Sequence, residues 1–378
     1  MKIGVVCYPT YGGSGVLATE LGMALADKGH EIHFITYNYP VRLDYLSHHL
    51  HFHRVDIEEY PLFQYQPYEL ALSSKMVEVV LKHNLEVLHV HYAIPHAYAA
   101  YMAKKMLQEK GIFIKVVTTL HGTDITLVGS HPTYKTAVEF SINHSDVVTA
   151  VSNNLKETTN ERFRITKDIQ VVYNFINLKK YEKEVEDDCQ RITLAEPDEI
   201  VLSHVSNFRS VKRVQDVIRT FYGVQKEVSA KLFLIGDGPD RFKAENLTKK
   251  LGISDRVFFL GNSTEVRKIL CYSDVFLLPS QTESFGLAAL EAMAAKNAII
   301  STNSGGLPEV NIHGKTGFLS EVGDVDDMVK NTLSVLQSKE TLAQFKMNAY
   351  EHSKSFSLDN IVPVYEDIYK NCLKVSVD

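Results

Sequence analysis

The sequence has few cysteines, no surplus of basic residues and no long apolar run. Its 378 residues include four scattered cysteines, Cys7, Cys189, Cys271 and Cys372. None stands in a C-x-x-C spacing, which indicates neither a zinc site nor a disulfide framework, and a reducing cytoplasm fits best. With 40 basic against 46 acidic residues, the net charge of -6 leaves no excess of cations for nucleic acid or for an acidic membrane surface.

No apolar run approaches the roughly 18 residues that a membrane helix needs. The apolar stretch at 3–8 is too short for the core of a signal peptide and leads into glycines, which predicts a first β-strand. A content of 45% hydrophobic and 23% charged residues is that of a globular protein, and the length exceeds what one hydrophobic core usually serves. We therefore expect two domains and no integral membrane segment.

Short β-branched runs recur in two series, each run followed by turn residues and a helical pattern, which is typical of βα units on a parallel sheet. The first series predicts strands at 2–7, 31–36, 87–91, 115–120 and 146–151, and the second at 200–206, 231–235, 256–260, 275–279 and 298–302. Between the series, residues 179–199 form a charged stretch with little apolar periodicity, as in a solvated connection.

These patterns predict an α/β protein made of two Rossmann-like domains whose parallel sheets face a central cleft. We place the N-terminal domain at 1–170 and the C-terminal domain at 171–361, with a helix at about 362–378 packing back on the first domain. Ligands of open α/β sheets bind beyond the carboxyl ends of the strands. Functional residues should therefore follow the strands directly.

The first predicted strand leads into the glycine loop GGSG at 12–15 and then into a helix beginning near Val16, so backbone N–H groups are presented to an anion. The loop also satisfies the dinucleotide pattern G-x-G-x-x-A. That pattern requires an acid after the second strand, which ends TYN at 36–38 instead. Contact with a phosphate or an acceptor is therefore favoured over a nicotinamide cofactor, with a bare tight turn as the alternative.

Two other predicted strand ends carry polar side chains. One strand delivers His121, which can donate a hydrogen bond to a sugar hydroxyl, with a structural histidine as the alternative. Another is followed by Asn207 and then by Arg209, Lys212 and Arg213. Three cations within five positions suit a diphosphate, with a solvated basic turn as the alternative.

The strongest single signal is the segment 279–294, which holds two acids separated by seven residues. Glu283 precedes the expected helix start at 284–286, and Glu291 lies about two turns inside the helix, facing the cleft. A carboxylate suits vicinal hydroxyls because it accepts two charge-assisted hydrogen bonds, so one acid can reach a hexose and the other a ribose. The free N–H groups of 284–287 would meet phosphate. A first-turn dipole partner and an exposed helical acid are the alternatives.

Two further motifs indicate structure before function. The glycine-containing segments at 305–309 and 314–318 are interpreted as tight turns. Four histidines between residues 48 and 53 resemble a metal-binding tract, but no carboxylate or cysteine stands at ligand spacing from them. We expect the polar face of a strand there and no metal site.

At the Glu283 and Glu291 pair the chain resembles glycosyltransferase family 4, whose members carry E-x7-E in the C-terminal domain of a GT-B fold. The resemblance covers nearly the entire chain and includes the glycine loop, the basic turn and the TGFL stretch at 316–319. It implies that Glu283 binds the donor sugar, Glu291 the ribose and Lys212 the diphosphate, with His121 near the primary hydroxyl of the sugar.

The basic turn departs from the family at one point. Many relatives carry Gly-Arg where this chain has Ser206-Asn207. The resemblance therefore leaves either Arg209 or Arg213 to supply the cation for the diphosphate.

Within that family, the segments YPTYGGSGVLATELG, HVHYAIPHAYAAYMAK, LHGTDITLVG and HVSNFRSVKRVQDVI resemble members that act in bacillithiol biosynthesis. The resemblance implies a cytoplasmic enzyme with UDP-N-acetylglucosamine as donor, L-malate as acceptor and no metal or other cofactor. The expected catalytic residues are His121, Lys212 and Glu283. The expected donor-binding residues are Gly15, Asn207, Arg209, Arg213, Gly261, Asn262, Ser284, Phe285, Gly286, Leu287 and Glu291. The acceptor-binding candidates are Ser14, Tyr92, Thr123 and Asn153, with Lys135 as a charge partner.

Members of family 4 retain the anomeric configuration, and the sequence offers no obvious carboxylate nucleophile for a double displacement. The resemblance therefore implies a front-face reaction, in which the departing β-phosphate accepts the proton of the malate hydroxyl while cations and backbone amides stabilise its charge. The chain also has no obvious D-x-D motif for a metal-bound diphosphate in a site loop. A GT-B sugar-nucleotide 2-epimerase and a non-catalytic sugar-nucleotide sensor stay as alternatives, and the sequence allows a homodimer.

Overall fold

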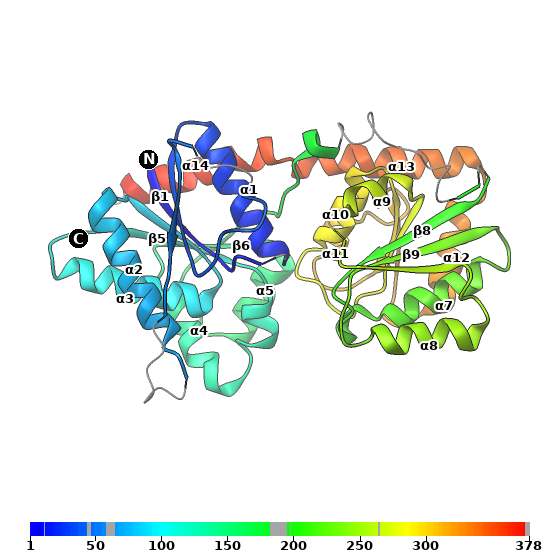
Figure 1. The fold of residues 1–378 in the computed structure, drawn as a ribbon, viewed down its shortest axis with the longest axis horizontal. Coiled ribbons are helices and arrows are strands. Elements are labelled where there is room, and N and C mark those ends of the chain that lie inside the picture. Colours follow the sequence, from blue (N-terminus) through cyan, green and yellow to red (C-terminus); the bar gives the residue numbers. More distant parts are fainter. Residues whose placement is uncertain are drawn as a thin grey trace. The chain divides into compact units, whose positions relative to one another are not determined.

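The computed structural model describes residues 1–10, 12–43, 47–57, 65–181, 195–196, 198–263 and 265–374. The chain divides into two compact units. Unit 1 comprises Met1–Asn174 and the C-terminal segment from Leu358, and unit 2 comprises Phe175–Ser357. The sequence places the two joins at 170/171 and 361/362. Each unit is a parallel sheet with helices on both faces (Figure 1), which confirms the α/β class with two Rossmann-like sheets.

The sheet of unit 1 has the strand order β3-β2-β1-β4-β5-β6-β7, with every pairing parallel. Its strands are β1 (Lys2–Val6), β2 (Glu31–Thr36), β3 (Leu50–Arg54), β4 (Val87–His91), β5 (Lys115–Leu120), β6 (Val147–Ala150) and β7 (Ile169–Val171). Its helices include α1 (Gly13–Asp27), α2 (Tyr68–His83), α3 (Tyr98–Gln108), α4 (Pro132–His144), α5 (Asn153–Arg162) and α14 (Leu358–Lys374), with the short π-helical turns η1 (Ala93–Ala97) and η2 (Thr123–Leu127). The five predicted strands are confirmed to within one or two residues, and β3 and β7 extend the sheet at its two edges.

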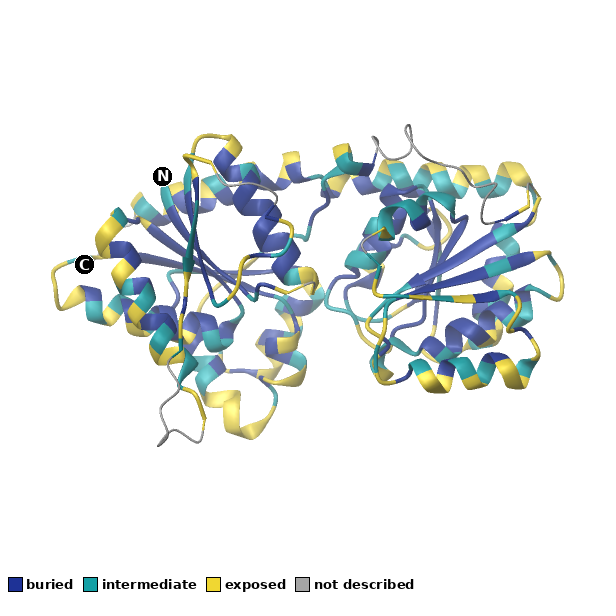
Figure 2. Cartoon of the chain, viewed as in Figure 1, coloured by how far each residue is buried: buried dark blue, intermediate teal, exposed yellow. Residues whose placement is uncertain are grey.

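Helices α1 and α14 lie on one face of this sheet, and α2, α3 and α4 lie on the other (Figure 1). The alternation of side chains along each strand separates the two cores. Ile35 of β2 packs with Met76 of α2, whereas Gly22 of α1 lies so close to Phe34 that a Cβ there would be 2.5 Å from the ring. Figure 2 shows strands that are mostly buried and helices exposed on their outer sides.

The sheet of unit 2 has the order β10-β9-β8-β11-β12-β13, again with parallel pairings. Its strands are β8 (Ile200–Val205), β9 (Ala230–Ile235), β10 (Val257–Gly261), β11 (Val275–Leu278), β12 (Ala298–Thr302) and β13 (Gly317–Ser320). Helices α7 (Val214–Val224), α8 (Arg241–Leu251) and α12 (Val325–Val335) cover one face; α9 (Val266–Tyr272), α10 (Leu287–Ala294) and α13 (Lys339–Ser353) cover the other (Figure 1). The short elements are η4 (Ser210–Lys212), α11 (Leu307–Val310) and η5 (Lys354–Phe356).

Strand β13 corrects the interpretation of 314–318 as a tight turn only. The turn ends at Gly317, which begins an edge strand paired with β12. A Cβ on Gly317 would lie 1.7 Å from the carbonyl oxygen of Ile299, so this close pairing requires glycine. No described helix of either unit is long and apolar enough to span a membrane.

Both sheets reverse their order at their first strand. In unit 1, β1 lies between β2 and β4, and in unit 2, β8 lies between β9 and β11. At such a point the loops after the two neighbouring strands run to opposite faces of the sheet. The crevice between them, at the carboxyl edge, is where ligands of open α/β sheets bind. A site is therefore expected at the segments after β1 and β4, and at those after β8 and β11.

Helix α14 completes unit 1 through a buried chain of hydrogen bonds. The hydroxyl of Tyr369 lies 2.8 Å from Nδ1 of His89 in β4, and Nε2 of His89 lies 2.8 Å from the hydroxyl of Thr119 in β5. The Thr119 hydroxyl in turn lies 2.8 Å from that of Thr149. Burial lowers the pKa of His89 to about 3, so the imidazole is neutral and links one donor to one acceptor.

We expect Tyr369→Phe to destabilise the protein by about 1–3 kcal/mol, because Nδ1 of the buried His89 loses its partner. Urea unfolding followed by circular dichroism measures the change. The matched control is Tyr134→Phe, at an exposed position on α4, which should leave the midpoint unchanged. Equal midpoints for the two variants would contradict this account of how α14 is held.

A second prediction concerns Glu366 of α14, which lies 2.5 Å from Nζ of Lys28 and 2.9 Å from Nε2 of His30. These hydrogen bonds, from His30 and then from Lys28, lower the pKa of Glu366 from 4.5 to about 2. A lowered carboxyl pKa contributes stability above the ordinary value, and the contribution is lost as the pH falls through the folded-state value. Wild type should therefore melt at a higher temperature than Glu366→Gln above pH 4.5, and the gap should close toward pH 2. A gap that does not change with pH would rule out the ionised pair.

Candidate active site

The crevice of unit 2 brings together a cation and an acid from two distant loops. Lys212 ends the turn after β8, Glu283 follows β11, and the Lys212 Nζ lies 2.5 Å from the Glu283 Oε1. The hydroxyl of Ser280 donates to the same oxygen at 2.9 Å. The amide of Gln281 donates to the carbonyl of Val211 at 2.7 Å, which fixes the two loops side by side. Two of the three predicted catalytic residues are thus in contact.

The backbone of Glu283 is held by a turn that the sequence analysis treated as structural. The amide of Gly306 donates to the Glu283 carbonyl oxygen at 2.8 Å. Gly305 has a φ of +60°, and a Cβ there would lie 2.0 Å from the same oxygen. The turn at 305–309 therefore has a positioning role, because it must approach the acid more closely than any side chain allows.

A neutral histidine ties the two strands behind this pair. Nδ1 of His204 in β8 lies 2.8 Å from the carbonyl oxygen of Leu277 in β11, and Nε2 lies 2.8 Å from the hydroxyl of Ser206. Burial lowers the pKa of His204 to about 4. The ring therefore adds no charge behind Lys212 at neutral pH.

The helix after Glu283 starts later than predicted. Helix α10 begins at Leu287, with Gly286 as its N-cap at a φ of 101°. Glu291 consequently lies one turn inside the helix and not two, and the first free helical amides begin at Leu287. Phe285 is buried with its ring 5.6 Å from that of Phe356, so its side chain belongs to the core. Of the remaining donor candidates here, Ser284 is partly buried.

The other donor candidates follow β8 and β10. Asn207, Arg209 and Asn262 are exposed, and Gly261 ends β10 at a φ of +64°. Gly236, at the end of β9, donates to the Gly261 carbonyl at 2.7 Å and so joins the neighbouring loops.

The structure distinguishes Arg209 from Arg213 as candidates for the cation that binds the diphosphate. Arg213 binds the buried carboxylate of Asp216 through Nε and through a terminal nitrogen, each at 2.6 Å. A guanidinium engaged in this way holds the start of α7 and has fewer donors for a ligand. Arg209 is exposed in the turn before Lys212 and is the better candidate for a second cation at this edge.

The crevice of unit 1 joins the glycine loop to the end of β4. The hydroxyl of Ser14 lies 2.6 Å from that of Tyr92, although 78 residues separate them. Helix α1 begins at Gly13, three residues before the predicted Val16, so Ser14 lies in its first turn. Gly15 is buried, and a Cβ there would lie 2.3 Å from the carbonyl oxygen of Tyr8. Its amide donates to Gly12 at 3.1 Å, which makes Gly15 a packing position first.

His121 stands beside this pair, at the end of β5. Its Nε2 lies 2.9 Å from Nδ1 of His91, and its ring centroid lies 5.1 Å from that of Tyr92. Burial lowers the pKa of His121 to about 3, so the neutral ring can act as a hydrogen-bond donor or acceptor.

A residue without an assigned role in the sequence analysis holds these loops together. The buried carboxylate of Asp124 accepts the amides of Ala93 and Gly122, each at 2.9 Å. It thereby joins the segment after β4 to the segment after β5. Its position in the HGTD motif directly after a strand was the available signal, and a carboxylate capping backbone amides is the physical reason for it.

The other two acceptor candidates, Thr123 and Asn153, and the expected charge partner Lys135 make contacts with residues other than the Ser14 and Tyr92 pair. Thr123 is exposed at the start of η2. Asn153 is exposed and donates to the hydroxyl of Tyr173 at 2.8 Å. Lys135, on α4, has its ammonium 6.0 Å from the ring centroid of Phe163, so the expectation of a charge partner for the acceptor receives no support from its contacts.

Two family models match the chain. The model for glycosyltransferase family 4 matches residues 11–180, and the model for glycosyl transferases group 1 matches residues 185–352. The N-acetyl-alpha-D-glucosaminyl L-malate synthase of Bacillus anthracis is 48% identical over 99% of this chain and 98% of its own length. An uncharacterized glycosyltransferase of Methanocaldococcus jannaschii is 25% identical over 97% and 96%.

Solved structures share the fold across nearly the full chain. HepE of Anabaena in complex with UDP-glucose aligns with a TM-score of 0.80 at 18% identity, covering 98% of this chain and 100% of its own. A sucrose-phosphate synthase of Thermosynechococcus elongatus aligns with a TM-score of 0.80 at 20% identity and covers 100% of both chains. Because the synthase of Bacillus anthracis matches almost every residue at 48% identity, this chain belongs to glycosyltransferase family 4 and has its GT-B fold.

Proposed function

We propose that this protein is a retaining glycosyltransferase that moves N-acetylglucosamine from UDP-N-acetylglucosamine to the hydroxyl of L-malate, the first step of bacillithiol biosynthesis. One observation carries the proposal, the 48% identity over 99% of the chain to the synthase whose name specifies that α-linked product. The sugar is also α-linked in the donor, so an α-linked product means retention.

Unit 2 supplies the donor contacts in this proposal. Among the described residues, both hydrogen bonds to the Glu283 carboxylate fall on Oε1, which leaves Oε2 for a sugar hydroxyl. An ammonium has three N–H donors, so Lys212 keeps two of them for diphosphate oxygens. Arg209 and the first amides of α10 add positive charge to the same loops. Glu291 on α10 is assigned to the ribose hydroxyls.

The transfer then proceeds on one face of the sugar. The bond from C1 to the β-phosphate oxygen breaks, the malate oxygen bonds to C1, and the malate hydroxyl proton passes to the leaving phosphate. Glu283 is not needed as a nucleophile, because its carboxylate is committed to Lys212 and to the donor hydroxyl. The side-chain cations stabilise the departing diphosphate, so we expect turnover without a divalent metal.

Unit 1 is assigned to the acceptor. Between the Ser14 and Tyr92 hydroxyls one proton is shared, so the other is left to donate to a carboxylate oxygen of malate. Burial raises the pKa of Tyr92 to about 12, which keeps this phenol protonated. His121 adds a neutral donor at the next strand end, and we assign Thr123 and Asn153 to the rim. Cys7 and Cys372 are free, buried thiols, and on that ground we place the reaction in the cytoplasm.

Incubation of the purified protein with UDP-N-acetylglucosamine and a panel of hydroxy acids tests the function. UDP should be released only with L-malate, and mass spectrometry with NMR should find an α-linked N-acetylglucosaminyl malate. EDTA should not reduce the rate. Epimerisation of the donor without acceptor would favour a 2-epimerase, and donor binding without turnover would favour a sensor.

The role of Glu283 has its own test. Glu283→Ala should lower kcat/KM at least tenfold, because a hydrogen bond to a charged group contributes about 1.5–3 kcal/mol and each 1.4 kcal/mol is a factor of ten. Thr282→Ala, at the exposed neighbouring position, is the control and should retain activity. Initial rates of UDP release measure both variants. A fully active Glu283 variant would remove the residue from the donor site.

A further inference from the structure

The outer edge of the unit 1 sheet gathers histidines from three elements. His33 of β2 is paired in register with His51 of β3, and His53 lies two residues further along the same face. Helix α2 packs on that face and ends at His83. Strand β3 confirms the predicted polar strand face.

The sequence has no carboxylate at ligand spacing from the histidine tract at 48–53, but the fold brings one alongside it. Glu31, at the start of β2, has its Oε1 3.0 Å from Nε2 of His33. The same oxygen lies 3.9 Å from Nε2 of His51. Parallel pairing brings the neighbouring strand alongside, so the carboxylate comes from about 20 residues earlier in the sequence, outside any local ligand spacing.

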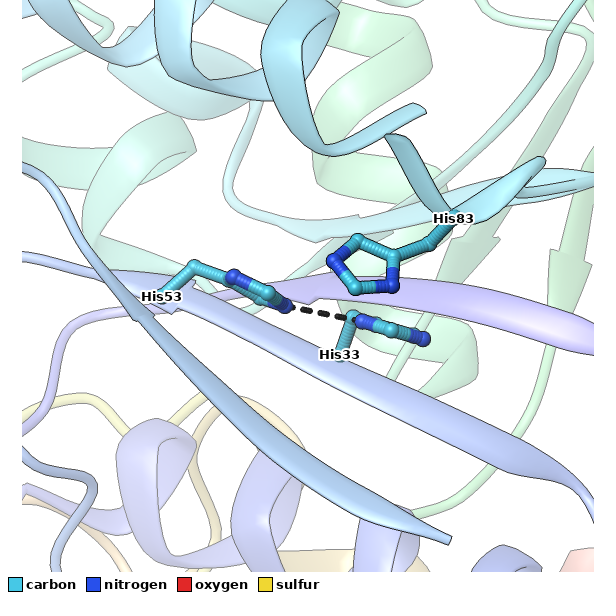
Figure 3. A group of neighbouring side chains, drawn as sticks. All are labelled: His33, His53 and His83. Carbon is cyan, nitrogen blue, oxygen red and sulfur yellow. Dashed lines mark hydrogen bonds between the residues drawn. The ribbon is translucent and has the colours of Figure 1, made fainter. Parts of the chain in front are cut away.

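The nitrogens of His33, His53 and His83 converge. Nδ1 of His33 lies 2.8 Å from Nε2 of His53, and the two rings meet edge to edge with an angle of 13° between their planes (Figure 3). The ring of His83 lies over this pair, with centroids 4.5 Å from His33 and 5.0 Å from His53. Nε2 of His83 is buried and has no hydrogen-bond partner among the described residues. One nitrogen from each ring lies within 4.8 Å of the other two.

We propose that His33, His53 and His83 bind a divalent transition metal ion, Zn²⁺, at this edge of unit 1. Nδ1 of His33 and Nε2 of His53 would face the ion, and the orphaned His83 Nε2 would be the third ligand. Two nitrogens on one tetrahedral zinc lie roughly 3.3 Å apart at Zn–N distances of about 2.0–2.1 Å. Small ring rotations are therefore enough to admit the ion, with water in the fourth position.

Glu31 fits this site as the partner of a ligand. A histidine that ligates metal through one nitrogen commonly donates its other N–H to a carboxylate, which fixes the tautomer. Nε2 of His33 is already directed at Glu31, so Nδ1 is the nitrogen that carries the lone pair. The other Glu31 oxygen lies 3.1 Å from Nζ of Lys2, which favours this outer role over direct ligation.

The ionisation of the cluster suits a cation at neutral pH. Burial lowers the pKa of His33 and of His53 to about 4, so both rings are neutral. To ligate through Nε2, His53 gives up its hydrogen bond to His33 and carries its proton on Nδ1 instead. Lys75 and Lys82 of α2 oppose a cation here, and the Glu31 carboxylate favours it. Three imidazoles select Zn²⁺ over Mg²⁺ or Ca²⁺, which prefer oxygen ligands.

The ion would clamp the fold and take no part in the transfer. Glu31 begins β2, His33 lies in its first half and His83 ends the helix before β4, so most of the cluster lies away from the carboxyl ends of the strands. The acceptor candidates follow the carboxyl ends. An ion held by β2, β3 and α2 stabilises unit 1 because the unfolded chain does not bring these ligands together.

Isothermal titration calorimetry of the EDTA-treated full chain with ZnCl₂ tests the site. Wild type should bind one equivalent, and zinc should raise its melting temperature. His53→Gln and His83→Gln should each weaken binding at least tenfold and lose the thermal shift. His49→Gln is the matched control, an exposed histidine of the same tract outside the cluster, and should bind as wild type does.

We expect the His83→Gln variant to fold, because position 83 ends a helix and its substitution changes no strand. Weaker zinc binding by this variant therefore reports the loss of a ligand. Metal-free UDP release by the variants should equal that of wild type, which shows that they are folded. No binding by wild type, or undiminished binding by His83→Gln, would overturn the proposal.

Discussion

The reversal of strand order beside the first strand of each sheet is the constraint on which both crevices depend. Parallel pairing of β8 with β11 delivers Lys212 and Glu283 to one edge across 71 residues of sequence, and pairing of β1 with β4 does the same for Ser14 and Tyr92. The strands themselves are almost wholly buried, so the cost of holding polar groups at their ends is met by the hydrophobic cores on both faces.

Close contacts between backbones position the loops that the strand order brings together. The carbonyl of Glu283 is clasped by Gly305 and Gly306, and Gly15 lies against the carbonyl of Tyr8. At each of these places a Cβ would overlap a backbone oxygen, so the loops approach one another as closely as main chains can. Buried histidines then join neighbouring strands without bringing charge, since burial keeps His89 and His204 neutral.

The central strands could be predicted because they are buried on both faces. Their apolar, β-branched runs identify them from the residues of the strand alone. The sequence missed the edge strands β7 and β13 because they are short, and it predicted β3 only as a polar strand face outside the two series. It found Lys212 and Glu283 by their places after strands, yet could not rank Arg209 against Arg213. Only the structure shows Asp216 taking up Arg213. The Glu31 carboxylate was missed for the same reason, since its partners come from the next strand.

Helix α14 has a consequence for the order in which the chain can be finished. Domains emerging from the ribosome generally fold as units, the first one first. Here His89 and Thr119, deep in unit 1, form hydrogen bonds with Tyr369 and Tyr365 of α14. Unit 1 therefore cannot be completed until the whole of unit 2 has been synthesised, and until then His89 and Thr119 lack their tyrosine partners. A ribosome that stalls within unit 2 therefore leaves unit 1 without helix α14.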